Sequence, residues 1–356
     1  MPQTLPQALL HQAHTRGSAI ALRYKRLGIW HERNWSELAH DVGRLAAGLS
    51  TLGFERDANL LIISQARPEA LLLTLAAQWL GGSVTLLDPD DDNRGLLENL
   101  KPGFVLAENL EALQQLRERG VTLYLDGRGL KHAPQADLIA YADLSADAVA
   151  PACATESSAP AFVFHAQTTL QLTHAQLLAG ARTLVAQAHV RGDDEALAAR
   201  VFAASGQARY LLAPWLHAGF RLNFPEALAT RDTDRRELGP TLVLGTRESY
   251  ARLAQSVQER LPLPGTFSHG VYRWGMQPTP SPLRRWLGHW LVRRPLLDVL
   301  GMSRLRVPLL VGPALSPQSA AFFGALGIHP GNWQEPSTRQ ASTDHLLSRA
   351  LHARTL

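Results

Sequence analysis

The chain has almost no cysteine and no long uninterrupted apolar run. Its one cysteine among 356 residues, Cys153, excludes an internal disulfide and a multi-cysteine metal site, and it fits a reducing cytoplasm. The longest apolar stretch, residues 70–87, is broken by Thr74, Gln78 and Gly81, which favours a buried helix and strand over a membrane span. The first residues lack the charged and then apolar pattern of a signal peptide. We therefore expect a cytoplasmic protein.

Lysine is also scarce, although the chain is basic. Only Lys25, Lys101 and Lys131 are lysines, so the formal net charge of +4 and the isoelectric point near 9.5 come mainly from arginine. The positive excess is diffuse and no nucleic-acid-binding motif accompanies it, so nucleic acid is not an expected partner. With 46% hydrophobic and 19% charged residues, the composition is that of a globular protein large enough for two cores.

Helix and strand patterns alternate along the first part of the chain. Asn34 with Glu37 three residues later is a capping signature, and apolar residues then recur at helical spacing. Short continuous apolar runs, typical of buried parallel strands, follow at residues 59–64, 83–87, 104–107 and 121–125. Strands separated by helices predict an α/β fold with parallel sheets that are covered by helices on both faces.

The same patterns predict two doubly wound α/β subdomains. Residues 1–150 form the first, an Ala/Ser/Pro-rich linker occupies 151–160, residues 161–335 form the second, and 336–356 are a polar tail. For the second subdomain we expect a helix over 173–189 and strands at 161–164, 199–203, 241–244 and 307–311.

The segment from Phe164 to Leu177 carries the most informative motif. It reads Phe-His-Ala-Gln-Thr-Thr-Leu-Gln-Leu-Thr-His-Ala-Gln-Leu. It resembles the phosphate-binding segment of adenylate-forming acyl-CoA synthetases, which reads aromatic-Thr-Ser-Gly-Thr-Thr-Gly-x-Pro-Lys-Gly-Val-x-Leu-Thr-His. Thr168 and Thr169 match the family's Thr-Thr pair, and the resemblance implies that they are a vestige of its phosphate contact. The glycines and the lysine that would hold ATP phosphates are missing.

The resemblance extends over residues from about 20 to 340 and is to the bacterial long-chain acyl-CoA synthetases. Further segments match in order: 24–38, 219–226, 235–241, 300–306 and 312–317. It implies the two-subdomain architecture of the large N-terminal domain of adenylate-forming enzymes. It also implies that the small C-terminal domain, with its catalytic lysine, is absent here.

Two further family motifs are altered. The family's Trp-Ile-Gly-Glu, near the acyl path, falls on residues 204–207, where Gly206 is kept and Gln207 replaces the acid. The family's Tyr-Gly-x-Thr-Glu, whose glutamate binds the metal held with ATP, falls on residues 329–338, where only Glu335 is acidic. The resemblance thus marks Gly206 and Gln207 as candidate substrate-binding positions, and it predicts no catalytic residue, no metal ligand and no bound cofactor.

A basic, tryptophan-bearing segment stands apart at residues 278–295. Four arginines flank two tryptophans and two leucines: Arg284, Arg285, Trp286, Leu287, Trp290, Leu291, Arg293 and Arg294. Such a helix can lie on an anionic membrane surface, so these arginines and tryptophans are candidate membrane-contact residues. In the alternative interpretation the aromatic stripe packs in the core and the arginines face solvent.

Three hypotheses follow. The preferred one is a non-catalytic scaffold, regulatory or acyl-binding protein linked to fatty-acid metabolism, with an acyl chain or a protein as partner. The second is an AMP-forming long-chain fatty acid–CoA ligase, active alone or completed by another chain, which would use ATP and Mg²⁺. The third is a protein bound peripherally to the inner membrane surface.

Overall fold

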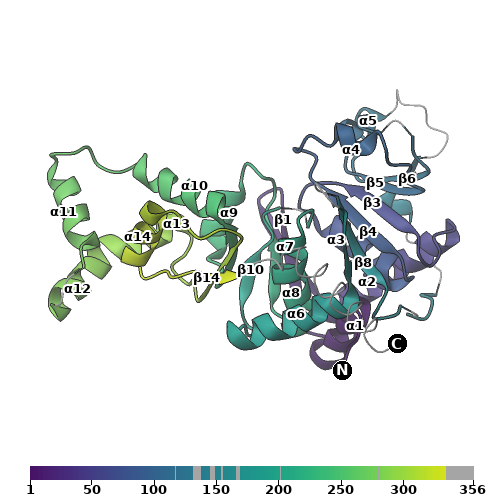
Figure 1. The fold of residues 1–356 in the computed structure, drawn as a ribbon, viewed down its shortest axis with the longest axis horizontal. Helices are drawn as coiled ribbons and strands as arrows, with labels where there is room; N and C mark the ends of the chain where they lie inside the picture. The colour runs from purple at the N-terminus through teal and green to yellow at the C-terminus, as the bar shows by residue number, and fades with distance from the viewer. Residues whose placement is uncertain are drawn as a thin grey trace, which may run out of the picture. The chain divides into compact units, whose positions relative to one another are not determined.

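The computed structural model describes residues 1–116, 118–130, 138–144, 149–153, 155–165, 169–200, 202–278 and 281–333. Two sheets of seven strands each make up the fold. Figure 1 shows helices flanking the strands. The expected α/β class and the predominantly parallel sheets are confirmed.

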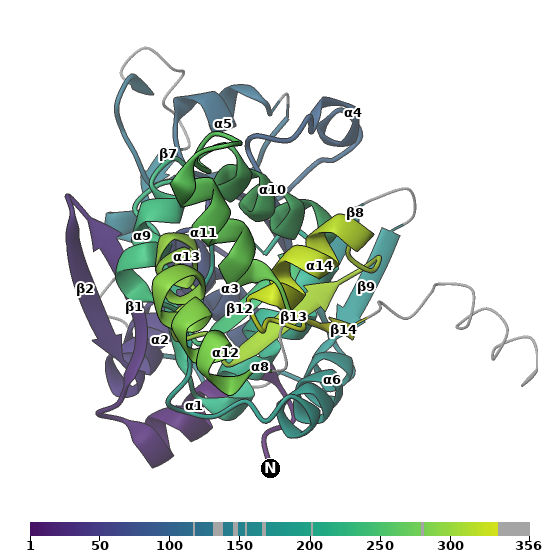
Figure 2. The same ribbon diagram turned by 90° about the vertical axis from the view of Figure 1, so that its left-hand side faces the viewer.

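The first sheet has the order β7-β6-β5-β3-β4-β8-β9. All its pairs are parallel except β8 with β9, which form an antiparallel hairpin that Figure 2 shows at one edge. Its central strands β3 and β4 are buried almost throughout, which accounts for their continuous apolar sequences. The strands are β3 Asn59–Ile63, β4 Ser83–Leu87, β5 Phe104–Ala107, β6 Val121–Tyr124, β7 Leu138–Ala140, β8 Pro160–His165 and β9 Thr169–Thr173.

The second sheet has the order β14-β13-β12-β10-β11-β1-β2. The edge pair β1 and β2 is antiparallel, whereas β1 runs parallel to β11, and β11 parallel to β10. The strands are β1 Ile20–Arg26, β2 Ile29–Asn34, β10 Glu195–Leu197, β11 Arg221–Phe224, β12 Leu242–Thr246, β13 Val307–Val311 and β14 Gly331–Trp333.

Most of the longer helices begin at a side-chain cap. Asn34 accepts a hydrogen bond from the backbone N–H of Glu37, whose carboxylate accepts one from the Asn34 N–H, so the predicted capping box is present. The helices are α1 Leu5–Arg16, α2 Trp35–Thr51, α3 Pro68–Trp79, α4 Arg94–Leu97, α5 Leu110–Gln114, α6 His174–Gln187, α7 Ser205–Gln207, α8 Ala213–Ala218, α9 Arg231–Leu238, α10 Arg247–Gln258, α11 Phe267–Met276, α12 Pro282–Gly288, α13 Arg294–Leu300 and α14 Pro317–Ala325. The described residues also form a 3₁₀ turn at Tyr141–Asp143 and π-helical turns at Ala208–Leu212 and His289–Arg293.

The chain divides into two compact units, residues 1–243 with 297–307 and residues 244–296 with 308–356. In the first unit Trp35 of α2 stacks on Trp215 of α8, with ring centroids 4.9 Å apart and both side chains fully buried. In the second unit α10 packs on α14, where Tyr250 meets Phe323 edge to face at 5.1 Å. Each unit therefore has aromatic core contacts of its own.

Each sheet contains strands from both sides of the expected linker at residues 151–160. The early strands β1 and β2 pair with β11, whereas β8 and β9, which follow the linker, pair with β4 of the first sheet. The expected strand at 199–203 is wrong, because the strand in this region is β10, Glu195–Leu197. β10 begins with a buried glutamate, so it is not a continuous apolar run, and the pattern used to predict buried strands did not identify it.

Candidate functional site

The segment that resembles the family's phosphate-binding motif contains the ends of the paired strands β8 and β9. Pairing runs from Pro160 with Thr173 out to His165 with Thr169, so only residues 166–168 join the two strands. Thr168 lies outside the described residues, and Thr169 is exposed on an edge strand. Strand pairing uses backbone N–H groups that a phosphate loop would direct at its anion.

The residues after the hairpin have structural roles. Thr173 accepts a hydrogen bond from the backbone N–H of Gln176, whose side chain accepts one from the Thr173 N–H, which caps α6. His174 is fully buried and its Nδ1 accepts a hydrogen bond from the Leu5 N–H at 3.2 Å. Burial lowers the pKa of this imidazole to about 4, so the ring is neutral at physiological pH.

The second motif position begins a helix that follows β10. Ser205 and Gly206 are buried in α7, and the Gln207 side chain accepts a hydrogen bond from the Ala204 N–H at 3.5 Å. The glutamine that replaces the family's acid thus closes the first turn of its own helix. The third motif position begins near β14, and Glu335 lies outside the described residues.

The carboxyl ends of β3, β4 and β5 carry a polar cluster that the sequence interpretation missed. Glu108, buried directly after β5, accepts hydrogen bonds from the Gln65 N–H at 2.6 Å and from Arg67 Nε at 2.7 Å. The connection after β3 leads to β4 on one side and that after β5 leads to β6 on the other, so the direction of the connections reverses between β3 and β5, and related open sheets bind ligands at such a point. Acidic residues directly after consecutive apolar strands, Asp88 and Glu108, were the sequence signal for this cluster.

An ion pair links this cluster to the second sheet within the first unit. Arg200, three residues after β10, lies 3.0 Å from the buried carboxylate of Asp88, directly after β4. Burial raises the pKa of the Asp88 carboxyl above its usual range, and the Asp90 backbone N–H and Arg200 oppose that shift. Asp88 and Arg200 thus pair with each other just beyond the carboxyl ends of β4 and β10.

The basic segment at 278–295 is brought together on one stretch of helix in the second unit, α12 with the π turn after it. Trp286 is 59% exposed and Trp290 47% exposed, so the interpretation that places the aromatic stripe in the core is wrong. Arg285 and Arg294 are exposed, while Arg284 and Arg293 are partly buried. The six candidate membrane-contact residues are therefore all at least partly exposed at the protein surface.

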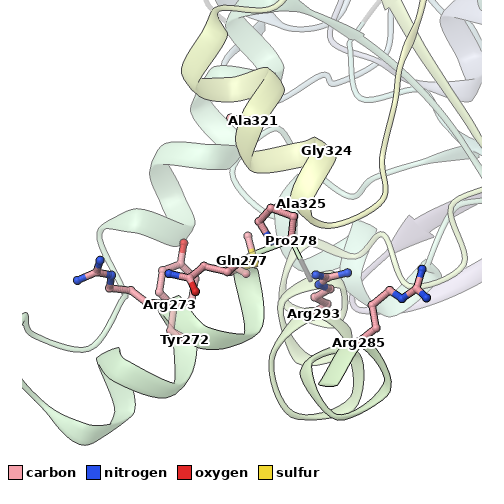
Figure 3. Close-up of a pocket in the computed structure, with 10 residues that line it drawn as sticks. Tyr272, Arg273, Gln277, Pro278, Arg285, Arg293, Ala321, Gly324 and Ala325 are labelled. Carbon is pink, nitrogen blue, oxygen red and sulfur yellow. The ribbon is translucent and has the colours of Figure 1, made fainter. Parts of the chain in front are cut away.

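A pocket of about 700 Å³ lies beside this segment, lined by side chains from the second unit. Figure 3 shows its three walls: Tyr272 and Arg273 on α11 with Gln277 directly after it, Arg285 and Arg293 from the α12 region, and small residues of α14. The guanidinium group of Arg273 points away from those of Arg285 and Arg293 in this view. The cationic groups do not converge on a single position.

No group of three or more His, Cys, Asp or Glu side chains could hold a metal ion within the described ranges. No helix among those ranges has the length and apolar character that a bilayer span requires.

The family of the chain follows from comparison with known proteins. The model of the AMP-binding enzyme family matches residues 9–330, so the chain belongs to this family. Over 88 residues it is 35% identical to the fatty acid–[acyl-carrier-protein] ligase MmaC of Mycobacterium marinum, a match that covers 25% of this chain and 16% of that protein. The resemblance inferred from the sequence motifs is thereby confirmed at the level of the family.

Solved structures of adenylate-forming ligases share the fold. Acetoacetyl-CoA synthetase from Streptomyces lividans superposes with a TM-score of 0.70 at 15% identity, over 94% of this chain and 52% of that one. The fatty acyl-adenylate ligase from L. pneumophila, in complex with acyl adenylate and pyrophosphate, superposes with a TM-score of 0.64 at 10% identity, over 92% and 53%. The chain thus spans about half the length of these two ligases.

Proposed function

We propose that this chain is a non-catalytic member of the AMP-binding family, a scaffold, regulatory or acyl-binding protein linked to fatty-acid metabolism. The single observation that carries the proposal is the β8–β9 hairpin, whose strands pair out to His165 and Thr169. The three residues that remain between the strands include no glycine and no lysine. A phosphate site of the family's kind needs several free backbone N–H groups and a nearby positive charge.

The other two motif positions support the same proposal. Gln207 caps its own helix where the family has an acid, and the altered third motif has lost its Gly-x-Thr-Glu pattern. Each lost electrostatic contact typically lowers a reaction rate by about 10²–10³. Because several are lost together on an otherwise well-packed scaffold, retention of structure without adenylation is the simplest account.

The polar cluster at the switch point favours a structural use of the fold. Glu108 is satisfied by Ser64, Gln65 and Arg67, and Asp88 is paired with Arg200. These contacts stabilise the ends of β3, β4 and β5 without a ligand. The link to fatty acids rests on the family and on the ligase MmaC, whose name describes a fatty-acid substrate.

ATP binding and ATP–pyrophosphate exchange test the proposal. We expect no saturable binding of ATP with Mg²⁺ by titration calorimetry, and no exchange with a panel of medium- and long-chain fatty acids. An intact ligase of the same family, assayed in parallel, is the positive control. Exchange above background, with this chain alone or with a separately expressed C-terminal domain of the family, would replace the proposal with the ligase hypothesis.

A fluorescent fatty-acid displacement assay then separates the acyl-binding role from the scaffold role. Saturable binding that natural fatty acids displace supports an acyl site. If there is no binding, the scaffold or regulatory role remains, and it requires a defined protein partner. A chain that bound neither an acyl chain nor a partner purified from its own cell would lose both roles.

A further inference from the structure

The stretch from Arg260, shortly after α10, to Leu297 within α13 carries charge of one sign only. Residues 260–297 contain six arginines and no aspartate or glutamate. Among the described residues no ion pair is formed by any of these six arginines, Arg260, Arg273, Arg284, Arg285, Arg293 and Arg294. In a chain whose net charge is only +4, this makes the segment a local concentration of positive charge.

The same segment exposes large apolar side chains. Phe267 at the start of α11 is 88% exposed, and Leu283, Trp286, Trp290 and Leu291 follow along α12 and its π turn, each at least 47% exposed. Positions 283, 286 and 290 lie three and four residues apart, so they share a face of the helix. We call this set, Leu283, Trp286, Trp290 and Leu291, the apolar stripe.

The stripe is exposed because the opposite side of the helix is committed to packing against α11. A Cβ added at Gly275 would lie 2.4 Å from Val292 Cγ2, and one added at Gly288 would lie 3.3 Å from the Gly275 Cα. Arg293 Nε also donates to the Gly275 carbonyl at 3.1 Å. With Gly288 and Val292 buried in this contact, the helix cannot turn its stripe inward without losing it.

Two tryptophans hold arginines close to the stripe. The Arg294 guanidinium lies 4.3 Å from the centroid of the Trp290 ring, and that of Arg284 lies 5.4 Å from the Trp274 ring. Aromatic rings beside cationic groups are the side-chain combination that favours the interface between acyl chains and anionic headgroups.

We propose that the hairpin of α11 and α12 docks on an anionic phospholipid surface. The apolar stripe lies among the first carbons of the acyl chains, and Arg285, Arg293 and Arg294 pair with headgroup phosphates. The pocket in Figure 3, with Arg285 and Arg293 on one wall and Arg273 directed elsewhere, fits several separate headgroups better than one small anion. This inference does not depend on whether the chain binds ATP or acyl groups.

A second copy of the chain fits this surface less well. A symmetric dimer would bring identical arginine-rich patches together, with no carboxylate in residues 260–297 to pair with them. An anionic bilayer supplies the opposite charge and an apolar layer at once, and docking of this kind needs no membrane-spanning helix.

Vesicle co-sedimentation of the full chain tests the proposal. We expect binding to vesicles of phosphatidylglycerol and phosphatidylcholine, no binding to pure phosphatidylcholine, and weaker binding as salt is raised. Each arginine near an anionic surface strengthens partition about fivefold, so Arg285→Ala with Arg294→Ala should weaken it about 25-fold. Trp286→Ala with Trp290→Ala should weaken it at least about tenfold through lost apolar burial.

A matched control removes the same charge elsewhere. Arg94 and Arg128 are exposed in the first unit, so Arg94→Ala with Arg128→Ala should leave vesicle binding unchanged. Inorganic phosphate should compete no better than sodium chloride of equal ionic strength. Thermal melts by circular dichroism check that all three double variants remain folded.

Three results would overturn the proposal. One is no binding to the anionic vesicles, and another is equal loss of binding in the Arg94/Arg128 control. The third is a dimer in lipid-free solution, measured by light scattering, that the tryptophan variant converts to a monomer. That result would assign the stripe to a second copy of the chain.

Discussion

Two pairs of tryptophans in this molecule have opposite environments. Trp35 and Trp215 stack in the core of the first unit with no exposed surface, whereas Trp286 and Trp290 in the second unit are 59% and 47% exposed. Both pairs stand in amphipathic helical sequence. The difference is that α2 packs against α1 and α3, and its Trp35 against Trp215 of α8, while the α12 region packs against α11 through the contact at Gly275 and Gly288. A helix-period pattern identifies an apolar face but not what covers it.

Alanine at one tryptophan of each pair gives the largest expected contrast. Trp35→Ala should lower the free energy of unfolding of the first unit by about 3–5 kcal/mol, because it leaves a large cavity beside Trp215. Trp286→Ala should change stability by no more than about 0.5 kcal/mol, since its side chain is exposed. Urea unfolding followed by circular dichroism measures both. A loss above 1 kcal/mol at Trp286 would mean that the stripe is covered in solution.

Two glycines of α11 test the packing that exposes the stripe. Gly275→Ala should destabilise the second unit by roughly 1–3 kcal/mol, because the new methyl group would overlap Val292. Gly270→Ala, in the same helix with nothing within 4 Å of the added Cβ, should stabilise it by about 0.5–1 kcal/mol. Thermal melts of the two variants should shift in opposite directions. Shifts in the same direction would contradict close packing at Gly275.

The pH dependence of stability reports on the neutral, buried His174. In the unfolded chain this imidazole titrates near pH 6.5, but in the folded protein its pKa is about 4. Between these values the unfolded state binds more protons, so the free energy of unfolding falls as pH is lowered, by about 2 kcal/mol from pH 7 to pH 5. At higher pH the imidazole is neutral in both the folded and the unfolded state, so its titration no longer lowers the free energy of unfolding.

The matched variant is His174→Asn, whose amide oxygen can accept the Leu5 N–H. Burial also lowers the pKa of His165 and His217, so both proteins retain a background of the same sign. The informative quantity is the difference between wild type and variant, which should shrink as pH falls. A difference that stays constant from pH 7 to pH 5 would show that His174 does not titrate in the way its burial requires.

The sequence predicted local features better than long-range ones. The Asn34 capping box and the strands at 83–87, 104–107 and 307–311 are confirmed, because each depends on residues close in the chain. The pairing of β1 with β11, the short strand β10 and the Arg200–Asp88 ion pair depend on residues far apart. Their side chains carry no local periodicity, so no pattern in one segment could reveal them.

The motifs in the sequence indicated the family of the chain, but they did not predict the local structure of the segments where the motifs are altered. Loss of the glycines and lysine between Thr169 and Leu172 was visible in the sequence. The extension of the β8–β9 ladder to His165 and Thr169 was not, since it depends on strand pairing. Exposure of Trp286 and Trp290 was likewise undetermined, because burial depends on the partner surface of the helix.

Two threonines of the former phosphate segment give the smallest expected contrast. Thr173→Ala removes the N-cap of α6 and should lower the free energy of unfolding by about 1 kcal/mol, because the Gln176 N–H loses its acceptor. Thr169→Ala, at an exposed edge position, should change it by no more than about 0.5 kcal/mol. Urea midpoints at constant m-value measure both, and Thr173→Ser, which keeps the capping oxygen, should restore most of the loss. If Thr169 proved the more important of the two, or if Thr169→Ala changed ATP binding, the hairpin would still have the function that its sequence suggests it has lost.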